Sequence, residues 1–105
     1  MPNHLLADIH ALIQADMWAL GSRRCRNKVA DLGYGREDVA SMILSLTENE
    51  FDEVWPDAET DLGTIQADVY LLNHPSDGCI YYIKLGINAS AGGQACVVAS
   101  FHLSS

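Results

Sequence analysis

The chain has 105 residues, 49% of them hydrophobic, which suits one domain with its own core and excludes a disordered chain. Its 14 acidic and 6 basic residues give a net charge of −8, which argues against indiscriminate binding to nucleic acid. No apolar run approaches the ~18 residues of a membrane span, and the N-terminus lacks a signal-peptide pattern. We therefore expect a single cytoplasmic domain over residues 1–105 that does not contact a membrane.

The first half of the sequence predicts helices. Apolar residues recur at three- and four-residue steps over 5–20, and a glycine follows. Ser22 can cap a second helix that ends at Asp31 or Leu32. A third amphipathic pattern covers about Arg36–Leu46, with acidic residues in its first turn.

An acidic segment follows these helices. Thr47 and Glu50 have the spacing of a capping box, which predicts a short turn continuing through 51–54. Pro56 should end it and begin an acidic loop over 56–63. The seven acidic residues of 48–61 lack calcium-loop spacing, so we interpret this segment as solvated rather than metal-binding.

The last forty residues predict three strands, Thr64–Leu72, Cys79–Ile87 and Ala95–Leu103. The segments between them, Asn73–Gly78 and Asn88–Gln94, are rich in turn-forming residues. Helices first and strands last indicate an α+β fold in which N-terminal helices pack on one face of a mainly antiparallel sheet. The other face is then free to form a site.

Two of these strands carry candidate catalytic residues. Side chains alternate between the faces of a strand, so Tyr82 and Lys84 should point the same way, as should Val98, Ser100 and His102. A phenol, an ammonium and an imidazole on one face can perform acid–base chemistry without a metal. An ordinary solvated sheet face is the alternative interpretation.

Four of the six basic residues are clustered at the start of the second predicted helix. Basic side chains there oppose the helix dipole, which suggests that they meet an acidic group. RNA, an acidic partner protein and the acidic segment of this chain are the candidates. The cluster consists of Arg23, Arg24, Arg26 and Lys28.

The cysteines do not suggest a metal site. Cys25, Cys79 and Cys96 lie far apart and have no zinc-type spacing with each other or with histidine. We interpret them as reduced thiols that pack as small apolar groups, and we expect no metal and no cofactor.

The order of short motifs resembles a known family. Leu32-Gly33, an amphipathic helix, LTENEF, DVY, YYIKL and SFH follow one another as in the motility quorum-sensing regulator (MqsR) toxins. The resemblance extends over about residues 5–103. It implies a small RelE-like, metal-independent endoribonuclease of a bacterial type II toxin–antitoxin system, with an antitoxin protein as partner and mRNA as substrate.

The family's catalytic positions are only partly matched. The resemblance places the family tyrosine on Tyr82, which is retained, and a family lysine on His102. A second family lysine falls on Glu53, which reverses the charge, and a family glutamine falls on Ala67, with Gln66 one residue early. These departures imply a weakened site, which Glu53→Lys with Ala67→Gln should restore.

Three functions therefore remain open. The first is an endoribonuclease toxin in which Tyr82 and His102 transfer protons and Lys84 offsets phosphate charge. The second is a catalytically degenerate relative that only binds an antitoxin or another protein. The third is a metal-free enzyme that acts on a small substrate in the same cleft.

Overall fold

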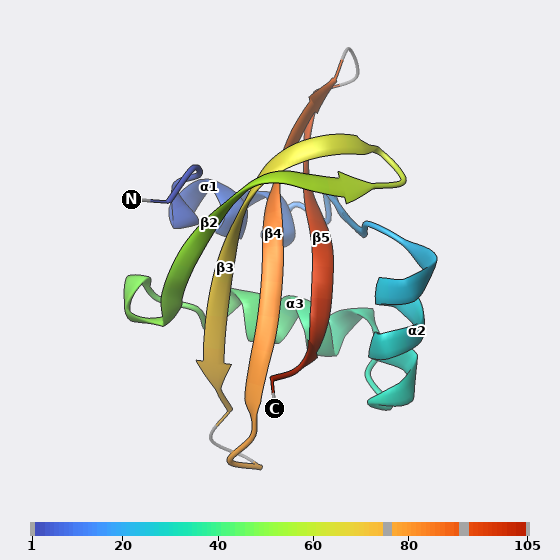
Figure 1. Cartoon of the computed structure of the whole chain (residues 1–105), viewed down its shortest axis with the longest axis vertical. Coiled ribbons are helices and arrows are strands. Elements are labelled where there is room, and N and C mark those ends of the chain that lie inside the picture. The colour runs from blue at the N-terminus through green and yellow to red at the C-terminus, as the bar shows by residue number, and fades with distance from the viewer. Residues whose placement is uncertain (1, 75–76, 91–92, 105) are drawn as a thin grey trace.

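The computed structural model describes residues 2–74, 77–90 and 93–104. Within them, five strands form one sheet in the order β1-β5-β4-β3-β2, and only the β1–β5 pair is parallel. α1 and α3 lie behind this sheet and α2 lies beside β5, so the predicted α+β class is confirmed (Figure 1). The elements are α1 (Leu6–Gln14), β1 (Trp18–Leu20), α2 (Arg23–Asp31), α3 (Arg36–Leu44), the 3₁₀ helix η1 (Glu48–Glu50), β2 (Phe51–Thr60), β3 (Gly63–Asn73), β4 (Ile80–Ser90) and β5 (Gly93–Leu103).

The first predicted helix is too long. α1 ends at Gln14, the backbone of Asp16 turns through a φ of 59°, and the chain then enters β1. Arg36 holds this turn, because its guanidinium donates to Asp16 Oδ1 at 3.0 Å and to the Trp18 carbonyl at 2.6 Å. It also lies 3.9 Å above the Trp18 ring. Of the apolar residues that continue the helical spacing beyond Gln14, Leu20 therefore lies in β1 and Met17 lies directly before that strand.

The other helix starts follow the sequence. Ser22 Oγ accepts the Cys25 N–H at 3.1 Å at the start of α2. The capping box is confirmed, since the Thr47 N–H donates to Glu50 Oε1 at 2.7 Å and begins η1. None of the helices in the described residues is long and apolar enough to cross a membrane.

The acidic segment after η1 is a strand. Phe51–Thr60 form β2 at the edge of the sheet, so the predicted turn over 51–54 and loop over 56–63 are wrong. Pro56 is tolerated because an edge strand forms backbone hydrogen bonds on one side only, and the register with β3 shifts here. The composition is misleading because the carboxylates of β2 all face solvent.

The three predicted C-terminal strands are confirmed and are longer than expected. β4 continues to Ser90 and β5 begins at Gly93, so most of the predicted loop over 88–94 is paired strand. Residues 91–92 of that loop, and residues 75–76 of the predicted turn over 73–78, lie outside the described part of the chain.

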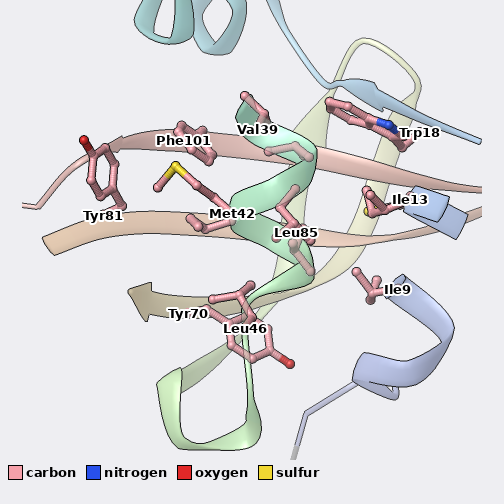
Figure 2. Close-up of a cluster of buried hydrophobic side chains, with 14 of the residues drawn as sticks. Ile9, Ile13, Trp18, Val39, Met42, Leu46, Tyr70, Tyr81, Leu85 and Phe101 are labelled. Carbon is pink, nitrogen blue, oxygen red and sulfur yellow. The ribbon is translucent and has the colours of Figure 1, made fainter. Parts of the chain in front are cut away.

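The main core lies between the sheet and the helices. Val39, Met42 and Leu46 of the α3 region pack against Tyr70, Tyr81, Leu85 and Phe101, which project from β3, β4 and β5 (Figure 2). α1 adds Ile9 and Ile13 to the same cluster. Burial of these side chains at roughly 1.5–3 kcal/mol each is the main stabilising contribution to this face.

The opposite face is partly covered by the β2–β3 hairpin. Pairing between β3 and β4 ends at Ala67 and Gly86, and the hairpin then crosses the sheet in front of β4 and β5 (Figure 1). A small second cluster lies beneath it, formed by Ala58, Ile65, Ala67 and Val97. The Asp61 N–H at the hairpin tip donates to the Gly21 carbonyl at 2.7 Å. The hairpin therefore joins the far edge of the sheet to the start of α2.

Candidate functional site

Tyr82 and His102 stack on the sheet face opposite α1 and α3. They are register partners on β4 and β5, and their rings lie 5.0 Å apart between centroids with an interplanar angle of 11°. The predicted placement on one face is confirmed. His102 Nδ1 lies 2.9 Å from the Leu103 carbonyl, which can only accept a hydrogen bond. Nδ1 therefore carries a hydrogen, and Nε2 is the nitrogen left to exchange a proton.

A bulge in β5 corrects one part of the predicted face. Lys84 pairs with Ser100, whereas the next residue of β4, Leu85, pairs with Val98. The extra residue of β5 turns Val98 into the main core. Ser100 and His102 remain on the candidate site face, so the prediction that Val98 points with them is wrong.

Lys84 is held between two aromatic rings. Its Nζ lies 3.8 Å from the centroid of the Trp55 ring and 5.8 Å from that of Tyr82. Burial lowers the pKa of this ammonium, and the nearby Glu53 carboxylate acts in the opposite direction. A cation that faces two rings and has lost part of its water interacts strongly with an incoming anion.

The phenol of Tyr82 is a proton donor rather than a base. Burial raises its pKa above the ordinary tyrosine value of 10.0, and the negative charges of Glu53 and Asp52 raise it further. The hydroxyl therefore stays protonated at neutral pH. It can donate a hydrogen bond to a phosphate oxygen beside Lys84.

Two residues of the basic cluster complete the site. Arg24 and Lys28 of α2 line a cavity of about 230 Å³ together with Tyr82, Lys84 and His102. The cavity has positive charge along two sides, from the helix and from β4. Its shape and charge suit a phosphate group.

The other two members of the cluster do not line this cavity. Arg26 pairs with Asp61 at the hairpin tip, with Nη2 and Oδ2 3.6 Å apart, and Arg23 is exposed. The basic cluster therefore meets both an open cavity and this chain's own acidic segment.

Two of the three unmatched family positions, Ala67 and Glu53, differ in accessibility. Ala67 is fully buried beneath the hairpin and contributes no polar group. Glu53 is exposed, and its register partner Val69 pairs in turn with Lys84. Residues paired in this way share a face. The carboxylate of Glu53 therefore lies on the same face as Lys84.

Trp55 and Cys25 are site residues that the sequence pattern did not assign to the site. Trp55 lies in a segment expected to be a turn, so nothing in the pattern placed it over Lys84. Ser100 and Cys25 also line the cavity. Burial raises the pKa of Cys25 to about 11, and its Sγ–H donates to the Val98 carbonyl at 3.5 Å, so it is no thiolate nucleophile near neutral pH.

The arrangement supplies proton donors and cations around one cavity. The described residues contain no group of three or more His, Cys, Asp or Glu side chains that could hold a metal ion. The chemistry available to the side chains themselves is proton transfer by an imidazole and stabilisation of negative charge by a phenol, an ammonium and a guanidinium.

The chain matches the sequence model of a known protein family. The sequence model of the family described as "Motility quorum-sensing regulator, toxin of MqsA" matches residues 1–102. No curated protein sequence and no solved structure shows significant similarity to the chain.

Proposed function

The chain belongs to the motility quorum-sensing regulator toxin family, and from that premise we propose that it is an endoribonuclease toxin that cleaves mRNA. One observation carries the proposal. The stacked Tyr82 and His102, the ammonium of Lys84 and the basic side chains of α2 converge on one cavity. These groups can hold a phosphate, stabilise the negative charge that grows on it and protonate the leaving oxygen when RNA is cleaved by its own 2′-hydroxyl.

The proposed roles follow from chemistry and position. Lys84, Arg24 and Lys28 hold the scissile phosphate and stabilise the charge that grows on its oxygens. The Tyr82 hydroxyl donates to one of these oxygens. His102 Nε2 gives a proton to the departing 5′-oxygen, because an imidazole exchanges protons readily near neutral pH.

We also propose that the protein pairs with an antitoxin of the kind named in the family description. A candidate is the product of a neighbouring gene. Binding of such a partner across the cavity would keep RNA away from Tyr82 and His102.

A binding module without catalytic activity is the second candidate. The buried methyl of Ala67 favours it, because the family places an amide at that position. Under this hypothesis the chain retains its antitoxin surface, whereas RNA bound in the cavity stays intact.

Induced expression with a readout of RNA integrity separates the two candidates. The endoribonuclease proposal predicts growth arrest and loss of full-length mRNA, both reversed when the neighbouring antitoxin is co-expressed. Lys84→Met should remove both effects while leaving the yield of soluble protein unchanged. Intact mRNA, together with tight binding to the neighbouring gene product, would instead favour the binding module.

A further inference from the structure

Cleavage of RNA by its 2′-hydroxyl needs a base and an acid at the same time. The base removes the proton from the 2′-oxygen, and the acid protonates the 5′-oxygen as it leaves. His102 can fill one of these roles. The other groups of the cavity do not fill the second, because Tyr82 and Cys25 keep their protons at neutral pH and Lys84 and Arg24 are cations.

Glu53 is a carboxylate on the site face. The pairings Glu53 with Val69, Val69 with Lys84 and Lys84 with Ser100 form one row across four strands. His102 lies two residues beyond Ser100 on β5, next to this row. Lys84 and Tyr82 of β4 therefore lie between Glu53 and His102.

The spacing of the strands fits a phosphodiester between these two side chains. Three strand spacings of about 4.8 Å separate β2 from β5, so the backbones of Glu53 and His102 lie on the order of 15 Å apart. Both side chains stand on the same face, so a phosphodiester that lies across β4 can reach from one to the other.

The Glu53 carboxylate is not held by a neighbouring side chain. The side chain of Glu53 makes no hydrogen bond and no ion pair with any part of the chain that the structure describes, unlike that of Glu50 on the preceding turn, which accepts from Thr47. Its charge nevertheless acts on the site, since it favours the protonated forms of both Tyr82 and Lys84 and so acts to raise their pKa values.

We propose that Glu53 is the general base of the RNA-cleavage reaction and that His102 is its general acid. This inference rests on the proposed function. The Glu53 carboxylate takes the proton of the 2′-hydroxyl while the 2′-oxygen bonds to phosphorus. The bond from phosphorus to the 5′-oxygen breaks, and the imidazolium of His102 protonates that oxygen. The products are a 2′,3′-cyclic phosphate and a 5′-hydroxyl, and exchange of one proton from Glu53 to solvent and one from solvent to His102 restores the site.

The charge balance of the site allows a carboxylate here. The phosphate meets three cations, Lys84, Arg24 and Lys28, so a single carboxylate beside them leaves the cavity positive. Trp55 covers one side of Lys84 and so keeps the ammonium beside the carboxylate partly out of water.

The test is the cleavage rate of a long RNA of mixed sequence by purified variants, from acidic to weakly alkaline pH. Glu53→Gln should lower the rate at neutral pH by about 10²-fold or more, because it keeps the size of the side chain but cannot accept the proton. The decline in rate on acidification should also disappear. The charged and titratable groups that face Glu53 are Asp52 on its own strand and Tyr82 and Lys84 on β4, and all are unchanged in this variant.

Glu59→Gln is the matched control. Glu59 is an exposed carboxylate on the same strand, next to Ala58, which points into the cluster beneath the hairpin. Its substitution should leave the rate within about twofold, and thermal melts should be similar for both variants. Wild-type cleavage that is unchanged or faster in Glu53→Gln would overturn the general base and leave the proposed function standing. Absence of wild-type cleavage would overturn both.

Discussion

The two faces of the sheet differ in burial and in the kind of side chain that they carry. The face beneath α1 and α3 is apolar and closed, and its large side chains, among them Phe101 and Ile83, are fully buried. The other face carries Tyr82, Lys84 and His102 around an open cavity between the sheet and α2. Side chains alternate between the two faces along β4 and β5. Each strand therefore has one row of side chains in the core, which stabilises the fold, and one row on the open face, where the candidate catalytic residues lie. Substitutions in the two rows should therefore affect different properties.

The largest effect is expected on the closed face. Phe101→Ala should lower the free energy of unfolding by about 3–5 kcal/mol, because the cavity left in the core cannot be refilled. That is a large part of the stability of a small domain. Chemical denaturation measures it. Leu103→Ala, on the same strand but 42% exposed, should change stability by less than about 0.5 kcal/mol. Similar decreases for the two variants would contradict the division between the faces.

A catalytic effect without a stability effect is expected on the open face. Lys84→Met keeps the length and apolar stem of the side chain but removes the charge that stabilises the transition state. The rate of RNA cleavage should decrease by about 10²–10³-fold. The melting temperature should stay close to that of the wild type. A decrease in activity that only accompanies unfolding would place Lys84 in the structural row.

The basic helix should affect binding more than chemistry. Arg24→Ala with Lys28→Ala removes two cations from the cavity wall, so affinity for single-stranded RNA should decrease. The plot of log affinity against log salt concentration should become less steep by about 0.7 for each phosphate that the helix no longer neutralises. Arg23→Ala is the control, because Arg23 is exposed outside the cavity. Equal slopes for all three proteins would show that α2 does not bind phosphate.

The smallest effect is expected at Trp55. Removal of the ring that faces Lys84 in Trp55→Ala should lower the cleavage rate by less than about tenfold, in keeping with a cation–π contribution of about 1 kcal/mol. Trp55→Phe keeps an aromatic face and should recover most of the rate. Failure of phenylalanine to restore activity would show that Trp55 acts in another way.

The helices and strands whose apolar residues recur at a regular spacing were predictable from the sequence. The starts of α2 and η1 depend on local caps at Ser22 and Thr47, and both formed as the sequence indicates. β1 was not predictable, because three residues are too few to show a period and their apolar spacing also fits the end of α1. β2 was not recognised as a strand because it contains acidic residues and Pro56. An edge strand tolerates such residues on its solvent side.

The site was predictable where side chains alternate regularly along a strand, and it was not predictable where a β-bulge interrupts this alternation. Tyr82, Lys84 and His102 were placed on one face correctly, whereas the bulge that buries Val98 has no signature in the sequence. The position of Trp55 over Lys84 depends on the pairing of β2 with β3, and the sequence pattern did not indicate that β2 is a strand.

Glu53 is the residue on which the sequence and the structure lead to opposite expectations. By resemblance alone, Glu53→Lys with Ala67→Gln should raise cleavage. The row that Glu53 shares with Lys84 favours a catalytic carboxylate instead. Ala67 is fully buried, so Ala67→Gln forces a polar side chain into a small apolar cluster and should destabilise the fold.

The most direct test of a catalytic open face is the cleavage of RNA by purified wild-type protein and by His102→Ala. We expect the wild-type protein to produce fragments ending in a 2′,3′-cyclic phosphate and a 5′-hydroxyl without added metal. His102→Ala should decrease the rate by at least about 10²-fold, because Nε2 no longer protonates the leaving oxygen. Robust wild-type cleavage that survives His102→Ala would place the chemistry elsewhere in the molecule.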